Sequence, residues 1–464
     1  MPSFPVFDKT LNQLSLELST RRLTRFPNWA VEGDSRLAAA SAYTKTGDII
    51  TAAQFQQRGV LTHLRRLIGQ RVDFPVTMNY AVPSTTSADM LARLTTTPIL
   101  ADLTSGRAEG VLALMGTNDR GSANMTAKQT IDNFMAWREQ ILATGARILW
   151  LAELPRGEAS FTAMRLASPQ LDNHLTIHRW LLAQAGIERS FVANCWPAFA
   201  NPASTTGDVK SGLTYDGLHP NGAGGVAMAP APAAWFNAEY PPVNILPSSN
   251  SDVWSATNPR GSLSPNPMTL GTGGSKVAGG STISGEVADS HTVTGVSATG
   301  LTIVCSKETV NGEEFQKIVI SGTPTVSGVN VELSANIPVA SLTADAVTGD
   351  MIYGVAQIDV PAGNTGWNGL VLGTRFLTVS GTPTTLSAQD GSVPVPSTQV
   401  GSAEAQPGPL RTSPVRISQA INSASAANAR VRVIVYPILN VACSVTVRIR
   451  CLSAFKDVDN LLLT

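Results

Sequence analysis

Three polar residues in the first half of the chain have the types that ester hydrolysis by a serine requires. Ser35 ends a Gly-Asp-Ser tripeptide, and Asp216 precedes His219 by three residues. A serine hydroxyl is a weak nucleophile at neutral pH, so an imidazole has to take its proton. The spacing of Asp216 and His219 lets the carboxylate reach the second ring nitrogen within one turn. We therefore predict Ser35 as nucleophile, His219 as base and Asp216 as orienting carboxylate.

Ester hydrolysis also needs hydrogen-bond donors directed at the oxygen that becomes negatively charged. The candidates are the backbone N–H groups of Ser35 and Ala81 and the side-chain amide of Asn118. Ser84 is a weaker candidate for the place assigned to Ala81. Asn118 lies in a Gly-Thr-Asn-Asp run, in which Asp119 is expected to cap a helix rather than to do chemistry.

Three motifs carry a resemblance to a known family. Gly-Asp-Ser at 33–35, Gly-Thr-Asn-Asp at 116–119 and Asp-Gly-Leu-His at 216–219, in this order, resemble motifs of the SGNH (GDSL-like) hydrolases. The resemblance covers roughly residues 25–238. It implies a three-layer α/β/α sandwich of flavodoxin-like type, with the four site residues in the roles predicted above. The family's second motif normally offers a glycine N–H to the oxyanion hole, where this chain has Ala81.

Strand-like runs and helical patterns alternate through the first half. Strands are predicted over residues 25–32, 72–80, 111–115, 148–152 and 191–194. Two helices are predicted. One follows from a run with apolar residues on a single face that ends at Gly145, and the other spans residues 172–185. This alternation predicts a parallel sheet with helices on both faces. Because ligands bind at the carboxyl ends of strands in such sheets, the motifs that follow the strands should meet at one edge.

The sequence changes in character from about residue 240. Residues 241–267 are rich in Pro, Ser and Asn, which predicts a linker. Beyond it, short runs rich in Val, Ile and Thr alternate with turn residues, as in an all-β sandwich or jelly roll. These runs are 301–305, 316–320, 329–333, 351–360, 369–379 and 443–451. Residues 387–412 are predicted to form a long surface loop or a boundary between two β subdomains.

The predicted fold class is thus an α/β three-layer sandwich followed by an all-β sandwich or jelly-roll region. The predicted segments are an N-terminal extension (1–25), an SGNH hydrolase domain (26–238), a linker (239–262) and a carbohydrate-binding or adhesin-like β region (263–464).

Charge and hydropathy exclude some partners. Basic and acidic residues number 33 each, so the formal net charge is +0. This balance argues against nucleic acid or an anionic membrane surface as a partner. The sequence shows no apolar run long enough for a membrane helix and no secretory signal pattern at its start, so neither membrane insertion nor signal-directed export is expected.

Cysteine and histidine spacing predicts neither a metal nor a cofactor. The four cysteines show no zinc-binding spacing, and we predict buried free thiols at Cys195, Cys305, Cys443 and Cys451. His174 and His178 are four residues apart and would share a helix face. Two histidines at that spacing can bind a metal, but a position on the helix surface is the favoured interpretation.

The β-rich second half suggests a biological context. An SGNH domain followed by such a region is similar in arrangement to polysaccharide esterases of bacteriophage tail spikes and fibres. The similarity implies O-deacetylation of a bacterial surface polysaccharide through an acyl-enzyme, in a virion-associated homo-oligomer such as a trimer; otherwise a cytoplasmic location is expected. Trp254, Tyr353 and Trp367 are equally suited to stacking on sugars and to core packing.

Two other functions remain open. An esterase for lipids or small esters would show an apolar acyl pocket and activity on longer chains. A receptor-binding or virion structural protein would keep the SGNH fold without catalysis.

Overall fold

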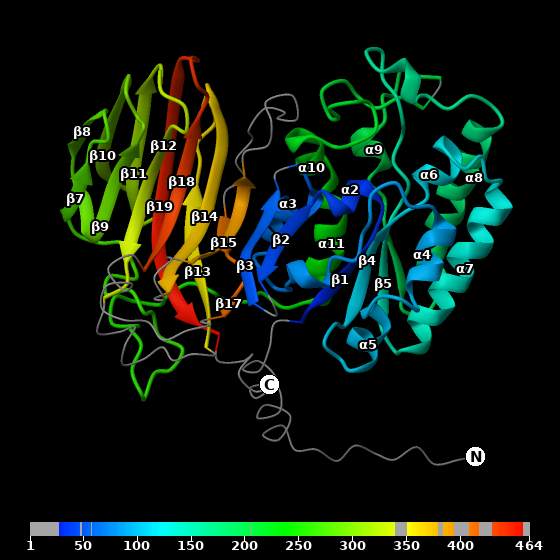
Figure 1. The fold of residues 1–464 in the computed structure, drawn as a ribbon, viewed down its shortest axis with the longest axis horizontal. Helices are drawn as coiled ribbons and strands as arrows, with labels where there is room; N and C mark the ends of the chain where they lie inside the picture. Colours follow the sequence, from blue (N-terminus) through cyan, green and yellow to red (C-terminus); the bar gives the residue numbers. More distant parts are fainter. Residues whose placement is uncertain are drawn as a thin grey trace.

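The computed structural model describes residues 27–46, 49–56, 58–205, 207–338, 350–378, 384–393, 408–416 and 429–457. The chain forms a helix-covered parallel sheet beside a stack of two larger β sheets (Figure 1). The predicted combination of a helix-covered parallel sheet and an all-β region is confirmed.

The parallel sheet has four strands in the order β1-β4-β5-β6. They are β1 (Trp29–Gly33), β4 (Gly110–Leu114), β5 (Arg147–Leu151) and β6 (Ser190–Ala193). Helices cover both faces, which explains why these strands are nearly continuous apolar runs. Four of the five predicted strands are confirmed. The prediction for 72–80 is wrong, because that segment forms only isolated bridges and the short 3-10 helix η1 (Val76–Met78), which follows Pro75.

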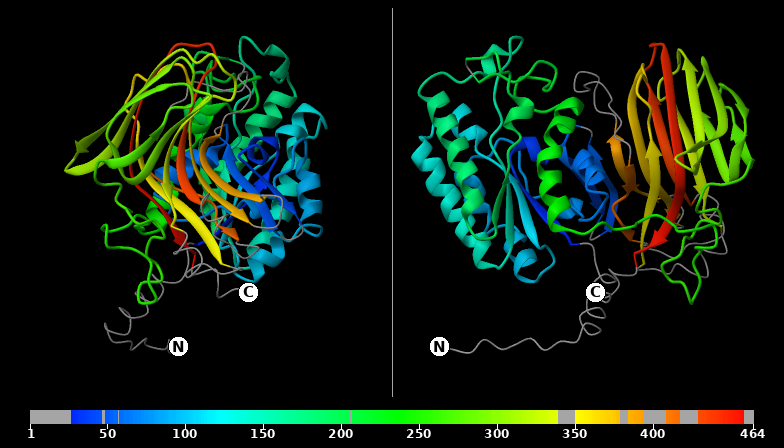
Figure 2. Two further views of the ribbon diagram at one scale, coloured as in Figure 1. Left: turned by 60° about the vertical axis from the view of Figure 1, so that its left-hand side comes forward. Right: turned by 180° about the vertical axis from the view of Figure 1, so that it is seen from behind.

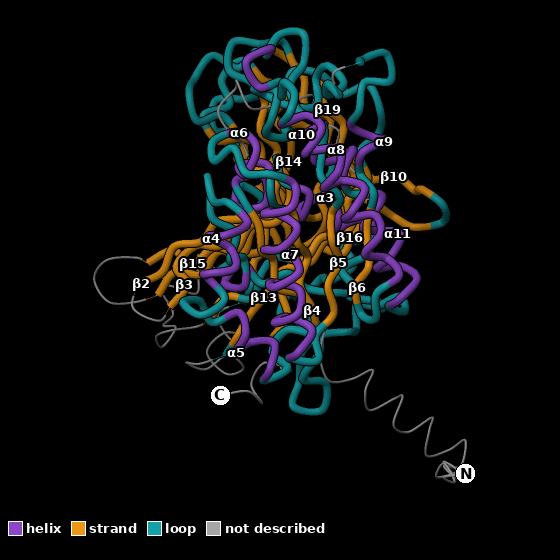
Figure 3. Tube along the Cα trace, turned by 90° about the vertical axis from the view of Figure 1, so that its right-hand side faces the viewer, coloured by secondary structure: helices purple, strands orange, loops and turns teal. Residues whose placement is uncertain are grey.

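Two groups of helices cover the parallel sheet. Helices α3, α10 and α11 lie on one face of the sheet, and α4, α5, α7 and α8 lie on the other (Figures 2 and 3). The apolar side chains of each group form a separate buried cluster with the strands. The helices are α2 (Ser35–Ala38), α3 (Val60–Leu67), α4 (Ser87–Arg93), α5 (Ile99–Thr104), α6 (Thr117–Gly121), α7 (Ala127–Ala143), α8 (Gln170–Ala183), α9 (Trp196–Phe199), α10 (Gly222–Met228) and α11 (Pro230–Glu239), with short 3-10 helices η2 (Thr162–Met164) and η3 (Gln184–Gly186). The two helices predicted from sequence correspond to α7 and α8.

The β region is a sandwich of two mixed sheets with a common apolar core (Figure 2). One sheet has the order β16-β13-β19-β11-β10-β8, and β17 also pairs with β13. The other has the order β2-β3-β15-β14-β18-β12-β9-β7. The strands after α11 are β7 (Gly273–Val277), β8 (Thr282–Gly285), β9 (Val287–Val296), β10 (Leu301–Val310), β11 (Glu313–Gly322), β12 (Asn330–Asn336), β13 (Met351–Asp359), β14 (Trp367–Thr378), β15 (Thr384–Val393), β16 (Gly408–Arg411), β17 (Val415–Arg416), β18 (Arg430–Pro437) and β19 (Cys443–Lys456). Jelly-roll connectivity stays a prediction.

An early hairpin joins the two parts of the molecule. Strands β2 (Ser41–Thr46) and β3 (Ile49–Gln56) lie between α2 and α3 in the sequence. Yet β3 pairs in parallel with β15, so the hairpin forms the end of the eight-stranded sheet (Figure 1). Arg65 of α3 adds a buried contact by donating to the carbonyl oxygen of Arg411 at 3.1 Å. Residues 387–412 are predicted to form a loop or a boundary between subdomains. This is wrong where the segment forms strands, in β15 and β16. Residues 394–407 lie outside the described part of the chain.

Several smaller predictions concern buried side chains. All four cysteines are buried and carry free thiols. Trp367 is buried in the β core, and Tyr353 stacks on Phe455. Trp254 is partly buried against the same core.

In the part of the chain that the structure describes, no helix has the length and apolar character needed to span a membrane. The described residues also contain no cluster of three or more potential metal ligands from His, Cys, Asp and Glu.

Candidate active site

Ser35 is the first residue of α2, directly after strand β1 and its connecting residue Asp34. The Asp34 carboxylate caps this short helix by accepting the Arg36 backbone N–H at 3.0 Å. Gly33 permits the sharp turn, because a Cβ there would lie 2.3 Å from the carbonyl oxygen of Leu114. Because Ser35 follows the carboxyl end of β1, it lies at the carboxyl edge of the sheet, as predicted, and its side chain is half-buried.

Ser35, His219 and Asp216 form one hydrogen-bonded chain. Ser35 Oγ lies 2.7 Å from His219 Nε2, and His219 Nδ1 lies 2.6 Å from Asp216 Oδ2. The second carboxylate oxygen, Asp216 Oδ1, accepts the backbone N–H groups of Leu218 and His219 at 2.9 and 2.8 Å. Gly217 makes this tight turn with a φ of +84°, in the left-handed region that favours glycine. The structure thus brings together the three side chains named from the sequence.

The same contacts keep Asp216 ionised. Burial raises the pKa of this carboxyl, but the hydrogen bonds from the His219 side chain and from the two backbone N–H groups outweigh burial. The pKa of Asp216 therefore lies below its ordinary value. An ionised carboxylate at Nδ1 orients the imidazole and stabilises the imidazolium, so the arrangement can accept a proton from Ser35.

The candidate oxyanion donors differ in availability. Asn118 donates one side-chain N–H to the carbonyl oxygen of Thr85 at 2.9 Å. The backbone N–H of Ala81 is donated to its neighbour Asn79 Oδ1 at 3.2 Å. Ser84 is exposed and has a φ of +63°, a left-handed conformation that glycine adopts without strain. Because the Ala81 N–H is already bonded to Asn79, Ser84 is kept as the alternative donor at this position.

A family model matches this part of the chain. Residues 33–225 match the GDSL-like Lipase/Acylhydrolase family. The matched range contains Ser35, Asn118, Asp216 and His219. No curated protein matches the chain. The GDSL-like region is thus the part that carries the hydrogen-bonded serine.

Solved structures that are similar to part of this chain cover about half of it. A GDSL-like lipase from Bacteroides thetaiotaomicron is 13% identical and covers 48% of this chain and 97% of its own, with a TM-score of 0.34. A carbohydrate esterase family 3 protein from Talaromyces cellulolyticus is 15% identical, with coverages of 46% and 99% and a TM-score of 0.32. A catalytic mutant of an acetylxylan esterase from Geobacillus stearothermophilus is 16% identical, with coverages of 47% and 96% and a TM-score of 0.31.

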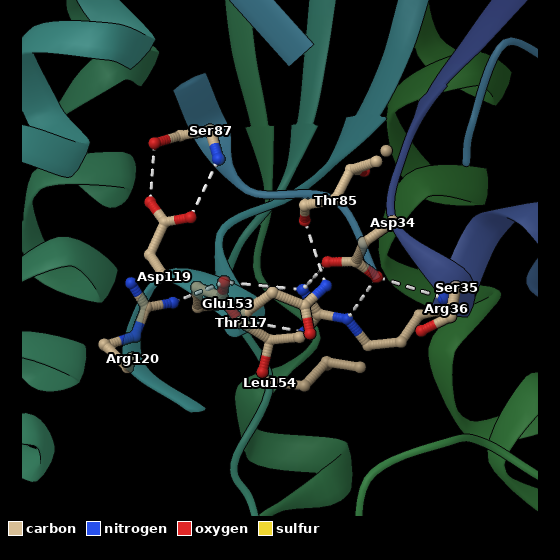
Figure 4. A network of polar contacts seen from close by, with 12 residues as sticks. Asp34, Ser35, Arg36, Thr85, Ser87, Thr117, Asp119, Arg120, Glu153 and Leu154 are labelled. Atoms are coloured by element: carbon tan, nitrogen blue, oxygen red, sulfur yellow. Dashed lines mark hydrogen bonds and ion pairs between the residues drawn. The ribbon is translucent and has the colours of Figure 1, made fainter. Parts of the chain in front are cut away.

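A buried ionic network lies directly behind Ser35 in the GDSL-like region (Figure 4). Glu153, which follows β5, joins Arg36 to Arg120. Burial raises the pKa of Glu153, but the two guanidinium groups outweigh it and hold the pKa at about 2. The sequence prediction missed this network, because Arg36, Arg120 and Glu153 lie far apart in the sequence and no motif joins them. A lone acidic residue in an apolar strand end was the signal available at Glu153.

The two histidines of α8 also belong to the interior of the GDSL-like region. The prediction that they lie on the helix surface is wrong, since His174 is 1% exposed and His178 is 9% exposed. His174 Nδ1 accepts a hydrogen bond from Arg120 Nε at 3.1 Å, and its Nε2 lies 2.9 Å from the carbonyl oxygen of Leu154. Burial and the charge of Arg120 lower the pKa of His174 to about 3. It is therefore a neutral partner of the network.

Asp119 serves a helix terminus, as predicted, but that helix is distant in sequence. Its carboxylate accepts the backbone N–H and the hydroxyl of Ser87 at 2.8 and 2.6 Å, at the first residue of α4. It also accepts the Thr130 hydroxyl at 2.7 Å. Asp119 is thus directed away from Ser35 (Figure 4), and its bonds hold α6 against α4 and α7.

Proposed function

We propose that this chain is a serine ester hydrolase that acts through an acyl-enzyme. The observation that carries the proposal is the continuous chain from Ser35 Oγ through the His219 imidazole to the Asp216 carboxylate. His219 Nε2 takes the hydroxyl proton while Ser35 Oγ bonds to the ester carbonyl carbon. The imidazolium then gives that proton to the departing alcohol, which leaves an ester on Ser35. Water, activated by the same imidazole, releases the acid and regenerates the serine.

The negative oxygen formed in each step needs donors around it. We assign this role to the backbone N–H of Ser35, the side-chain amide of Asn118 and the backbone N–H of Ser84. Ser84 replaces Ala81 in this assignment, since the Ala81 N–H already donates to Asn79. Loss of one donor of this kind typically lowers kcat about 100- to 1000-fold.

The proposed substrate is an acetyl ester on a polysaccharide. Short polar side chains, namely Ser84 and Thr85 before α4 and Asn118 in α6, belong to the segments proposed to surround the ester, which suits a small acyl group on a hydroxyl-rich alcohol. The eight-stranded sheet also begins close by, because β2 starts at Ser41, three residues after α2 ends. A glycan bound along the end of this sheet would extend toward the serine. We propose a surface polysaccharide of bacteria as its source and a virion-associated oligomer as its setting.

A panel of esters tests the proposal. Nitrophenyl acetate, butyrate and octanoate are compared, together with acetate release from an O-acetylated bacterial polysaccharide. The expected result is the highest kcat/KM for acetate and a loss of at least about 1000-fold in Ser35→Ala. Preference for octanoate would instead identify a lipid esterase. Equal, slow hydrolysis by wild type and Ser35→Ala would show a non-catalytic binding protein.

A further inference from the structure

The two residues that flank Ser35 are tied to each other. Arg36 Nε and Nη2 donate to the two carboxylate oxygens of Asp34 at 2.9 and 2.7 Å, in a bidentate pair. Both side chains are fully buried. The backbone that carries Ser35 is therefore held on its buried side by the Asp34–Arg36 ion pair, which limits how far α2 can rotate.

The residues around Asn118 are held in a comparable way. Thr117 accepts, through its carbonyl oxygen and its hydroxyl, hydrogen bonds from Arg156 Nη1 at 2.8 and 3.1 Å. On the other side, Asp119 accepts the backbone and hydroxyl donors of Ser87. The amide of Asn118 is thus presented from a helix whose neighbouring side chains are all bonded to the interior.

Glu153 connects these two segments. Its Oε2 accepts from Arg36 Nη1 at 2.9 Å, and its Oε1 accepts from Arg120 Nη2 at 2.8 Å. Arg36 adjoins the serine, Arg120 lies two residues after Asn118, and all three side chains are fully buried. Figure 4 shows Glu153 between Arg120 on one side and Arg36, next to Ser35, on the other.

We infer that Glu153 is a positioning residue that sets the separation between the Ser35 nucleophile and the Asn118 oxyanion donor. The inference rests on the proposed ester hydrolysis. The buried network holds three carboxylates, Asp34, Asp119 and Glu153, and three guanidinium groups, Arg36, Arg120 and Arg156. If Glu153 loses its charge, three buried cations face two buried anions, and Arg36 and Arg120 both lose a bonded carboxylate, so at least one of them must move toward water. Movement of Arg36 displaces α2, and movement of Arg120 displaces α6, so either one disturbs the alignment of nucleophile and donor.

Two Glu153 variants and a matched control test the inference. Glu153→Gln removes the charge at nearly constant shape, and Glu153→Asp keeps the charge but withdraws the carboxylate by one methylene. The control is Asp73→Asn, which also breaks a buried ion pair, that with Arg65 at 3.3 Å. The backbone of Asp73 forms a β-bridge with Asn28 just before β1. Asp73 therefore lies at the opposite end of β1 from Ser35.

The expected result separates alignment from stability. Glu153→Gln should lower kcat for nitrophenyl acetate about 100-fold and leave KM within about threefold, because misplacement of the reacting groups acts on the transition state. The rate at which a fluorophosphonate labels Ser35 should fall in parallel, and Glu153→Asp should lie between Glu153→Gln and wild type. Asp73→Asn should lower the melting temperature while keeping kcat near that of wild type.

Other outcomes overturn one claim or the other. A folded Glu153→Gln or Glu153→Asp protein with wild-type kcat and labelling rate overturns the inference and leaves the proposed function standing. The same is true if kcat falls equally in Asp73→Asn, since the effect then follows stability. A wild-type protein that neither hydrolyses the ester nor reacts with the fluorophosphonate overturns the proposed function, and the inference with it.

Discussion

The ring of Tyr215 lies nearly parallel to the imidazole of His219, with 5.5 Å between ring centroids and 13° between planes. The Arg58 guanidinium hydrogen-bonds the Tyr215 side chain. Burial and the neighbouring Asp216 charge raise the pKa of Tyr215, so its hydroxyl stays neutral at physiological pH. The imidazole is thus held by a flat surface as well as by Asp216.

Removal of that ring should weaken catalysis without abolishing it. Ring stacking contributes roughly 0.5–1.5 kcal/mol, so Tyr215→Ala should lower kcat roughly 3- to 10-fold. Tyr215→Phe keeps the ring and should stay near wild type in steady-state kinetics on nitrophenyl acetate. If Tyr215→Phe falls as far as Tyr215→Ala, the hydroxyl and its Arg58 contact matter, and the stacking explanation is wrong.

Ser84 gives a second prediction, which concerns backbone strain. A non-glycine residue in the left-handed region costs about 1–2 kcal/mol, and Ser84 has a φ of +63°. Ser84→Gly should therefore raise the free energy of unfolding by about 1 kcal/mol, measured by urea denaturation. Ser84→Gly and Ser84→Ala should both keep kcat, because the backbone N–H remains. A large loss of kcat in Ser84→Ala would show that the hydroxyl, rather than the N–H, is what the site uses.

The Ser35, Asp216 and His219 arrangement was predictable because its geometry is local or topological. Asp216 and His219 meet within a single turn, and parallel strands bring their following residues to one edge. The choice between Ala81 and Ser84 was not predictable. It depends on the hydrogen bond between the Ala81 N–H and Asn79 and on the backbone angle φ of Ser84. Neither can be deduced from the residue types.

Long-range pairing limited the prediction of the fold. Strand β3 of the β2–β3 hairpin pairs with β15, more than 300 residues later in the chain. Neither segment contains a pattern from which this pairing could be predicted. A Gly47-Asp48 pair between two β-prone runs was the available hairpin signal.

The buried charges were missed for a related reason. Arg36 and Glu153 would be assigned to the surface by residue type, and only their mutual contact makes burial possible.

The neutral, buried His174 predicts loss of stability in acid. Its pKa is about 3 in the folded protein, against an ordinary value of 6.5 that the unfolded chain retains. Below pH 6.5 the unfolded chain therefore binds a proton that the folded protein does not, and the free energy of unfolding falls as pH falls from 6.5 toward 3. The slope from this one group approaches about 1.4 kcal/mol per pH unit.

Urea unfolding of wild type and His174→Gln across this pH range measures that contribution. Glutamine can still accept from Arg120, but it does not titrate. The variant should lose stability less steeply than wild type as the solution is acidified, by about one proton in the slope. Glu153, whose pKa is lowered to about 2, should add a further loss in both proteins below its ordinary value of 4.5. Identical slopes in the two proteins would show that His174 is protonated in the folded state.

The shared sheet predicts that the GDSL-like region depends on the β region. A fragment ending at residue 262 lacks β15, so β3 is left as an unpaired edge, and Arg65 loses the carbonyl of Arg411. The fragment should aggregate or melt at a lower temperature than the whole chain, as followed by light scattering and differential scanning calorimetry. A monomeric fragment with the melting temperature and esterase activity of the whole chain would contradict this dependence.

The central claim is that Ser35 is the nucleophile, and covalent labelling tests it most directly. The whole chain is treated with a fluorophosphonate, digested, and the modified peptide is identified by mass spectrometry. The account predicts a single adduct on Ser35, absent in Ser35→Ala and strongly slowed in His219→Ala. An unlabelled Ser35 in a folded protein, or ester hydrolysis that persists in Ser35→Ala, would contradict it.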